Sequence, residues 1–205
     1  MNQNHEADLI SRLAEYGKEN KIPTIDPEAG ALLAGLVAQT RPRFLLEIGT
    51  AIGYSTLIMA MNLPPEGHII TIDIDEERTK IAKAIVTDAG YGDKVSFLTG
   101  DGTVLTQTLS GPFDLVFIDG AKGQYPAYLT AIIPKLSDKA LIVADNVLFR
   151  GYIENSAAPP RRYKTIVKRL RDYLDTVTHQ PGFETKILPI GDGLAVTQFT
   201  REKQR

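Results

Sequence analysis

Short apolar runs alternate with helical patterns along this chain, and no other feature limits the fold as strongly. The helical patterns follow the i, i+3, i+4 spacing and cover residues 5–20, 27–40, 54–63, 75–89, 124–136 and 163–177. The apolar runs are nearly continuous, as in strands buried on both faces, and cover residues 44–49, 68–73, 95–98, 113–118, 140–144, 183–188 and 194–199. This order predicts an α/β fold with a seven-stranded, mostly parallel sheet and helices on both faces.

The last two predicted strands are separated by Gly191-Asp192-Gly193, a short glycine turn that allows them to pair as an antiparallel hairpin at one edge of the sheet. A length of 205 residues is typical of one domain. We therefore expect a single domain over residues 1–205, in which N-terminal helices (1–40) precede the sheet core (41–205).

The composition excludes several classes of protein. The chain has no cysteine, which excludes a disulfide framework, a zinc finger, an iron–sulfur site and a thiol nucleophile. Its longest apolar runs are about five residues, too short to span a membrane. It starts with polar residues and no apolar core of a signal peptide, so a cytoplasmic protein is expected. The net charge of −2 argues against general nucleic-acid binding, although it leaves a local basic patch open.

Acidic side chains recur where the predicted strands end, which is where parallel α/β sheets bind ligands. They are Glu47, Asp73, Asp101, Asp119 and Asp145. Gly49 and Gly53 follow the first strand with the spacing G-x-x-x-G, whereas a dinucleotide-binding loop has G-x-G-x-x-G. A nicotinamide oxidoreductase is therefore disfavoured, and the strand-end Asp73 is a candidate partner for ribose hydroxyls. A tight turn followed by a solvated aspartate is the alternative.

Four segments together resemble the metal-dependent O-methyltransferases of the catechol and caffeoyl-CoA type. They are Glu47-Ile48-Gly49-Thr50, Gly53-Tyr54-Ser55, Phe117 to Lys122 and Asp145-Asn146-Val147. The resemblance implies a Rossmann-like class I methyltransferase fold, S-adenosylmethionine as cofactor and a homodimer. It also implies a set of cofactor-binding residues, namely Ile25, Glu47, Gly49, Ser55, Asp73, Asp101, Gly102 and Asp119.

Asp119, Asp145 and Asn146 are candidate metal ligands. Asp119 and Asp145 end consecutive parallel strands, so they are expected side by side. Carboxylate and amide oxygens suit Mg²⁺, with Mn²⁺ or Ca²⁺ as alternatives. The competing interpretation is that these three residues are turn and cap residues.

Lys122 is the candidate general base, with Asp119 as its catalytic partner. A cation at a helix start opposes the helix dipole, and a nearby divalent ion would disfavour its protonated form. The resemblance gives the matching lysine the role of removing a proton from one of two adjacent substrate oxygens, which then attacks the methyl group. A solvated lysine is the alternative.

The segment 159–171 holds six cations and no acid. Its apolar residues share one helical face, so the cations are expected to point outward. The candidate substrate contacts are Arg150, Arg161, Arg162, Lys164, Lys168 and Arg169, with Phe149 or Tyr152 as an aromatic partner for a base. A solvated helix face explains such a charge run equally.

The runs DNVLFRG (145–151) and RRY-x-TIVKRLR (161–171) resemble the bacterial branch that methylates 5-hydroxyuridine in tRNA. The resemblance implies conversion of that wobble nucleoside to 5-methoxyuridine. Two alternatives remain open: the same chemistry on a small catechol or caffeoyl-CoA-like compound, and an RNA-binding protein of this fold without turnover. The presence of Asp119, Lys122, Asp145 and Asn146 together argues against an RNA-binding protein without turnover.

Overall fold

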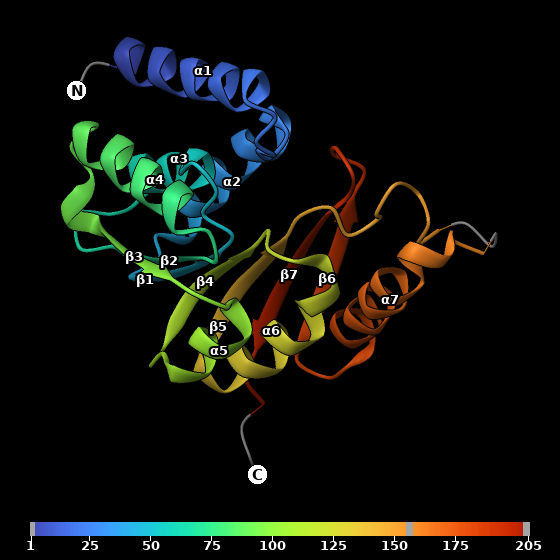
Figure 1. The fold of residues 1–205 in the computed structure, drawn as a ribbon. Helices are drawn as coiled ribbons and strands as arrows, with labels where there is room; N and C mark the ends of the chain where they lie inside the picture. The colour runs from blue at the N-terminus through green and yellow to red at the C-terminus, as the bar shows by residue number, and fades with distance from the viewer. Residues whose placement is uncertain (1–2, 155–157, 203–205) are drawn as a thin grey trace.

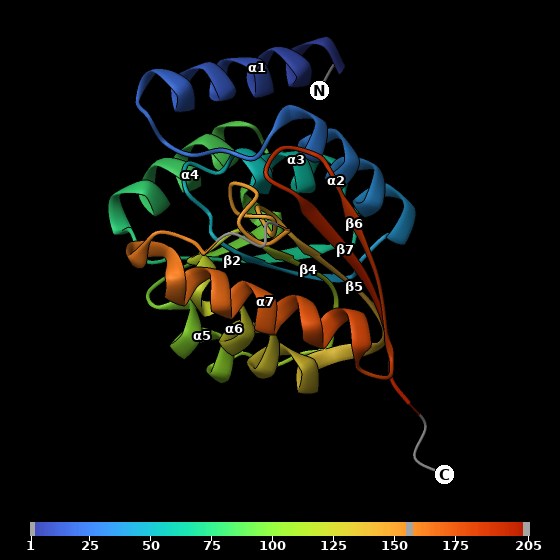
Figure 2. The same ribbon diagram turned by 90° about the vertical axis from the view of Figure 1, so that its right-hand side faces the viewer.

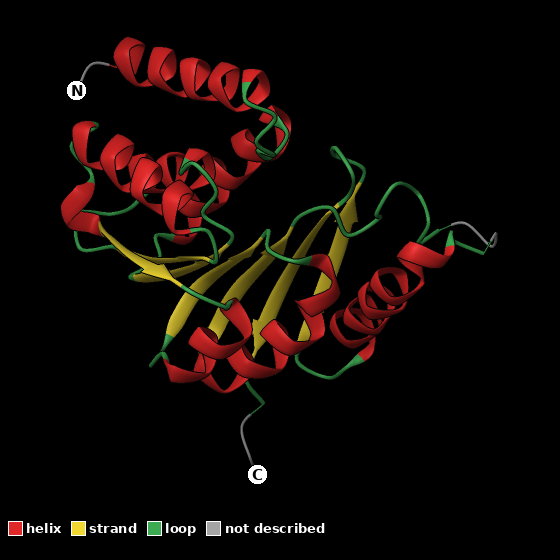
Figure 3. Cartoon of the chain, viewed as in Figure 1, coloured by secondary structure: helices red, strands yellow, loops and turns green. Residues whose placement is uncertain are grey.

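Seven strands form one sheet at the centre of the computed structural model, which describes residues 3–154 and 158–202 (Figures 1 and 3). Their order across the sheet is β3-β2-β1-β4-β5-β7-β6. Strands β1 to β5 run parallel, and β7 pairs antiparallel with both β5 and β6. The strands are β1 (Phe44–Ile48), β2 (His68–Asp73), β3 (Val95–Thr99), β4 (Phe113–Ile118), β5 (Leu136–Ala144), β6 (Phe183–Leu188) and β7 (Leu194–Thr200). The expected sheet and its antiparallel C-terminal hairpin are confirmed.

Helices cover both faces of the sheet. In Figure 2, α1 to α4 lie above it and α5 to α7 below it. The helices are α1 (Gln3–Glu19), α2 (Pro27–Thr40), α3 (Tyr54–Asn62), α4 (Glu76–Asp88), α5 (Gly102–Thr108), α6 (Tyr125–Ile132) and α7 (Lys164–His179). None of the helices in these described ranges has the length and apolarity needed to cross a lipid bilayer.

Two hydrophobic cores, one on each face of the sheet, follow from the alternation of side chains along the strands. Leu45 packs with α1 to α4, and its neighbour Leu46 packs with α6 and α7. Both leucines are fully buried. This two-sided burial explains why the central strands are apolar throughout, and it leaves the strand ends as the places where polar residues meet.

Local capping sets the helix starts. Asp26 accepts a hydrogen bond from the Glu28 amide at 2.9 Å, and Pro27 opens α2, as its sequence predicts. Asp75 caps α4 by accepting from the Arg78 amide at 3.0 Å. These caps place the first turns of α2 and α4 close to the carboxyl ends of the strands.

Candidate active site

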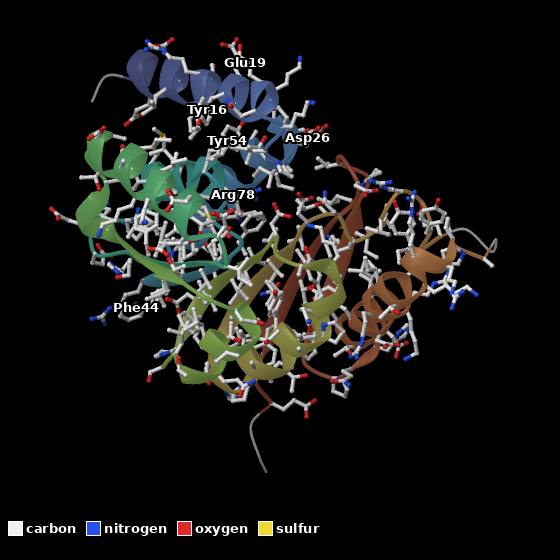
Figure 4. All side chains as sticks on the ribbon, in the orientation of Figure 1. Tyr16, Glu19, Asp26, Phe44, Tyr54 and Arg78 are labelled. Atoms are coloured by element: carbon white, nitrogen blue, oxygen red, sulfur yellow. The ribbon has the colours of Figure 1, made fainter. Side chains whose placement is uncertain are left out.

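A cleft of about 700 Å³ opens at the carboxyl ends of the parallel strands. Figure 4 shows Arg78, which lines the cleft, and Phe44, which begins β1 and so lies at the amino ends of the parallel strands, away from the cleft. The loops that follow β1, β2, β3, β4 and β5 all contribute to its lining. Residues lining it include Gly49, Ala51, Asp73, Asp101, Gly102, Asp119, Lys122, Asn146, Phe149 and Arg150. The structure therefore places most of the candidate cofactor, metal and base residues around one cavity, whereas Arg150 is the one candidate substrate cation among the described residues that lines it.

The glycine loop is held against the ends of β2 and β4. Asp73 accepts hydrogen bonds from the Ala51 amide at 2.7 Å and the Asp75 amide at 2.9 Å. Gly49 has a φ of 109°, and a Cβ there would lie 2.5 Å from the Asp119 carbonyl oxygen. Position 49 therefore requires glycine, because the loop passes too close to the end of β4 for any side chain.

Glu47 and Ser55 lie beneath the cleft and are not among the residues that line it. The Glu47 carboxylate is fully buried and accepts hydrogen bonds from the hydroxyls of Ser55 (2.5 Å), Thr71 (2.6 Å) and Thr56. Burial raises the pKa of Glu47 to about 7, although the three hydroxyls act in the opposite direction. These bonds join β1, β2 and the start of α3 below the glycine loop. A direct contact of Glu47 or Ser55 with the cofactor stays a prediction.

The raised pKa of Glu47 predicts a pH-dependent stability. An exposed glutamate titrates near 4.5, so this group's contribution is fully present below that pH and is lost as the pH rises through about 7. Relative to Glu47→Gln, the free energy of unfolding of the unsubstituted protein should fall by about 3 kcal/mol between roughly pH 5 and 8. Urea denaturation of both proteins at the two pH values measures this difference. If the free energies of unfolding of the two proteins changed equally with pH, this would contradict the burial of an ionisable carboxyl at Glu47.

The adenine-side candidates lie beyond β3. Asp101 caps α5 by accepting from the Thr103 amide at 2.7 Å. A Cβ on Gly102 would lie 3.1 Å from both Ile48 and Tyr128, so a side chain there would crowd the cleft wall. Tyr128 lines the cleft and was not identified from the sequence, because its position in a helix marks it only as a core residue.

Ile25 is buried beside the cleft and does not line it. Its chain neighbours Pro23 and Thr24 do line it. The segment before α2 therefore closes one side of the cavity, and a contact between Ile25 and the methionine part of the cofactor stays a prediction.

Asp119 and Asp145 lie side by side, as the order of the strands predicts. Ile118 and Ala144 are paired across β4 and β5, and the Asp145 amide donates to the Ile118 carbonyl at 3.0 Å. The two aspartates directly follow these residues. Asn146 adopts a left-handed conformation with a φ of 54° and donates its amide to the Asp145 carboxylate at 2.7 Å. The three candidate ligands thus lie at the neighbouring carboxyl ends of β4 and β5, where Asp119 and Asn146 line the cleft and the buried Asp145 does not.

The donor set at this point fits a hard divalent cation. Asp145 is 3% exposed, and burial together with the charge of Asp119 raises its pKa to about 6. A cation between the two carboxylates would offset both effects. No cluster of three or more His, Cys, Asp or Glu with metal-binding geometry occurs in residues 3–154 and 158–202, so a three-ligand site here needs the Asn146 amide oxygen.

Lys122 begins a short 3-10 turn after β4, and its side chain lines the cleft. Its Nζ donates to the Asp119 carboxylate at 2.5 Å, and both side chains are about one-fifth exposed. The amine therefore lies beside a candidate metal ligand, within a site that is largely shielded from water.

Asp192 is a site residue that sequence reasoning missed. It lies in the turn between β6 and β7, lines the cleft and accepts from the Arg150 amide at 2.6 Å. The Leu148 amide also donates to the Asp192 carbonyl at 3.0 Å. In sequence, Gly191-Asp192-Gly193 indicates only a turn, and the long-range contact has no local signal.

The basic segment forms the exposed face of α7 and of the 3-10 turn before it. Val167, Leu170, Leu174 and Val177 are buried, as their spacing predicts. The candidate substrate cations Arg161, Arg162, Lys164, Lys168 and Arg169 are exposed. Lys168 pairs with Asp172 at 3.3 Å.

Three aromatic rings cluster between the cleft and this basic face. The ring centroids of Phe149 and Tyr163 lie 5.4 Å apart, and those of Tyr152 and Tyr163 5.8 Å apart. The Arg150 guanidinium donates to the Tyr163 hydroxyl at 3.0 Å and lies 5.4 Å from the centre of that ring. Phe149 and Arg150 also line the cleft, so this aromatic cluster (Phe149, Tyr152 and Tyr163) joins the cavity to the cationic surface.

Comparison with known proteins identifies the family. The family model described as O-methyltransferase matches residues 3–199. The chain belongs to this O-methyltransferase family. It is 33% identical over 184 residues to a caffeoyl-CoA O-methyltransferase of Petroselinum crispum, covering 84% of this chain and 75% of the relative. A catechol O-methyltransferase of Niastella koreensis is 35% identical over 142 residues, or 66% of this chain and 64% of that protein. The resemblance stated from the motifs is confirmed at the level of the family.

Solved structures agree with the fold of this O-methyltransferase. The O-methyltransferase from Bacillus cereus in complex with SAH has a TM-score of 0.84 and 25% identity, covering 94% of this chain and 91% of that chain. The O-methyltransferase TomG from Streptomyces achromogenes in complex with SAM has a TM-score of 0.85 and 26% identity, covering 94% and 90%. These neighbours support S-adenosylmethionine as the cofactor of this enzyme, while the metal and the substrate are matters of proposal.

Proposed function

We propose that this O-methyltransferase uses Mg²⁺ to methylate a substrate hydroxyl that has a second oxygen atom beside it. The observation that carries the proposal is the placement of Asp119, Lys122 and Asn146 in one cleft beside the glycine loop, with the buried Asp145 directly before Asn146 at the end of β5. Mn²⁺ is an alternative metal for the same ligands.

Each group of residues has a separate task in this reaction. Gly49, Asp73 and Asp101 would hold the cofactor, which supplies the methyl group. Mg²⁺ held by Asp119, Asp145 and Asn146 would supply positive charge that stabilises negative charge developing on the substrate. The Lys122 amine, in its neutral form, would accept the hydroxyl proton at Nζ.

The walls of the cleft add orientation to this chemistry. Residues on five different loops line it, so the substrate oxygen and the methyl donor can be held in contact and in line. Arg150 and the aromatic cluster stand at its edge, where the non-reacting part of a substrate would lie.

The proposed substrate is 5-hydroxyuridine at the wobble position of tRNA, converted to 5-methoxyuridine. Its 5-hydroxyl lies beside the O4 carbonyl, which provides the two adjacent oxygens. The exposed cations of α7 support phosphate binding, and the aromatic cluster supports stacking of an unpaired base. The bacterial-branch motifs at 145–151 and 161–171 contribute both features.

A small catechol or caffeoyl-CoA-like compound is the second candidate substrate. The names of the relatives from Niastella koreensis and Petroselinum crispum favour it. The same four residues at the metal and base site would serve either substrate. The basic surface distinguishes tRNA from a free catechol, whereas the phosphates of a caffeoyl-CoA-like compound would also bind basic residues.

Charge reversal in the basic segment, at the 3-10 turn and the first residue of α7, tests the identity of the substrate. A triple variant, Arg161→Glu, Arg162→Glu and Lys164→Glu, should lower kcat/KM for tRNA at least about 100-fold and leave catechol methylation within about twofold, because phosphate contacts depend on these charges. Methyl transfer to undermodified tRNA and to catechol measures both rates. The control is Lys80→Glu with Lys83→Glu, on the exposed face of α4.

The outcome in cells decides between the substrates. In a deletion strain, nucleoside mass spectrometry of tRNA should show loss of 5-methoxyuridine-type nucleosides. Unchanged levels of those nucleosides would overturn the tRNA assignment and favour the small-molecule candidate. The proposed homodimer is measured separately, by light scattering of the purified protein.

A further inference from the structure

Tyr125 is a fully buried residue that contacts the strand ends carrying the candidate metal ligands. It is the first residue of α6, directly after the turn that begins with Lys122. Its hydroxyl donates to the Asp145 carbonyl at 2.9 Å and lies 3.3 Å from the Ile118 carbonyl. One phenol therefore connects the ends of β4 and β5.

The contact lies where the pairing of the two strands stops. Ile118 and Ala144 form the last pair between β4 and β5, and the Asp145 amide still reaches the Ile118 carbonyl. On the other side, Ala144 is also the last residue of β5 that pairs with β7. The Asp145 carbonyl thus lies beyond both ladders, and a buried carbonyl needs a donor. Tyr125 supplies it.

This hydrogen bond fixes the peptide unit between two candidate ligands. The Asp145 carbonyl is part of the planar peptide that joins Asp145 to Asn146. Asn146 follows with a φ of 54°, a left-handed conformation that asparagine adopts more readily than most other L-residues. By holding that carbonyl, Tyr125 sets the directions from which both side chains leave the backbone.

The ring of Tyr125 also contacts the candidate base. The Lys122 Nζ lies 5.6 Å from the centre of this ring, within the range of a cation–π contact. The rings of Tyr125 and Tyr173 also form a T-shaped contact, with centroids 5.6 Å apart. Contacts therefore hold both the ring of Tyr125, through Lys122 and Tyr173, and its hydroxyl, through the Asp145 carbonyl.

We infer that Tyr125 is a positioning residue, whose hydroxyl holds Asp145 and Asn146 in the geometry that binds the divalent cation. The inference rests on the metal dependence given as the proposed function. It concerns the binding of the metal and leaves the binding of S-adenosylmethionine unchanged, because the glycine loop and Asp73 make no hydrogen bond to Tyr125 in the described residues.

The test compares two tyrosine-to-phenylalanine variants. Tyr125→Phe keeps the ring and removes the hydroxyl that bridges the strands. Tyr173→Phe is the matched control, because Tyr173 is equally buried and its hydroxyl has no hydrogen-bond partner among the described residues. Both variants keep the ring that packs in the core, so both are expected to fold.

The first readout is binding of Mn²⁺ to the protein saturated with S-adenosylmethionine, followed by electron paramagnetic resonance. We expect Tyr125→Phe to weaken Mn²⁺ binding about tenfold, as changes to groups that orient metal ligands do. Tyr173→Phe should bind Mn²⁺ within twofold of the unsubstituted protein. The second readout is kinetic: excess Mg²⁺ should restore most of kcat in Tyr125→Phe, because the defect is in affinity.

The outcomes separate this inference from the proposed function. Equal Mn²⁺ binding by Tyr125→Phe and the unsubstituted protein would overturn the inference alone. An equal loss of binding in both variants would also overturn it, because the cause would then be general packing. Absence of Mn²⁺ binding by the unsubstituted protein would overturn the metal dependence, and the inference with it.

Discussion

Lys122→Met should lower kcat by about 10³-fold while the affinity for S-adenosylmethionine stays within about twofold. A general base contributes roughly 10²- to 10⁴-fold to a rate, and methionine keeps an unbranched side chain of nearly the same length while removing the proton acceptor. The Lys122 amine is positioned by Asp119 at 2.5 Å, on the cleft wall. Single-turnover kinetics and calorimetric titration with the cofactor measure the two quantities.

The control for this substitution is Lys80→Met. Lys80 lies on α4, is 60% exposed and pairs with Glu76 and Glu77 on the same helix. It should keep kcat within twofold of the unsubstituted enzyme. A Lys122→Met enzyme with unchanged kcat at neutral pH would show that another group accepts the proton.

Asp145→Asn should remove the stimulation of turnover by Mg²⁺ and lower kcat about 10³-fold. The substitution keeps the shape of the side chain and removes the charge. A divalent cation contributes several kcal/mol to the stabilisation of a transition state, and each 1.4 kcal/mol is a factor of about ten in rate. Initial rates across a Mg²⁺ titration, with EDTA as the metal-free point, measure the effect.

Asp138→Asn is the matched control, because Asp138 lies on the same strand β5 at its other end, with a side chain that is 90% exposed. It should respond to Mg²⁺ as the unsubstituted enzyme does. Full activity of Asp145→Asn in EDTA would contradict the proposed metal dependence. Binding of S-adenosylmethionine by that variant would exclude unfolding as the cause of its lower kcat.

The sheet was largely predictable, because its central strands are apolar on both faces and helical patterns separate the parallel strands. The boundaries of β5 were not. The prediction began at residue 140, whereas the strand begins at Leu136, because Ser137, Asp138 and Lys139 interrupt the apolar run. Those residues join the sheet through backbone pairing, such as Lys139 with Thr200, which side-chain hydropathy does not report.

Helix α5 was missed for a related reason. Its sequence, Gly-Thr-Val-Leu-Thr-Gln-Thr, is short and rich in β-branched residues, which have low helix propensity. It forms because Asp101 caps it and because Gly102 and Thr106 are buried against the sheet. The strand-end position of Asp101 predicts a ligand of the cofactor, and the β-branched residues after it conceal its role as a helix cap.

In the candidate site, too, some features follow from the order of the strands and others depend on tertiary contacts. The order of the strands alone predicts that Asp119 and Asp145 are neighbours, and the structure places them at the adjacent ends of β4 and β5. Asp192 and Tyr125 depend on tertiary contacts: a hairpin turn that folds back over the cleft, and a core ring that reaches two carbonyls. Neither contact leaves a local pattern, since a glycine-flanked aspartate and a helical tyrosine are common in any α/β protein.

The position of β7 between β5 and β6 has a consequence for biosynthesis. The loop after β5 is held by the turn before β7: the Val147 amide donates to the Gly193 carbonyl at 2.9 Å, and the Arg150 amide to the Asp192 carboxylate. β7 follows every other strand in chain order and is therefore the last to leave the ribosome. A nascent chain that has already made β1 to β5 still lacks these hydrogen bonds to the loop that follows β5. Translation products that end after Asn146 and before Gly191 should therefore carry all three candidate metal ligands and yet lack the turn that holds the loop after β5.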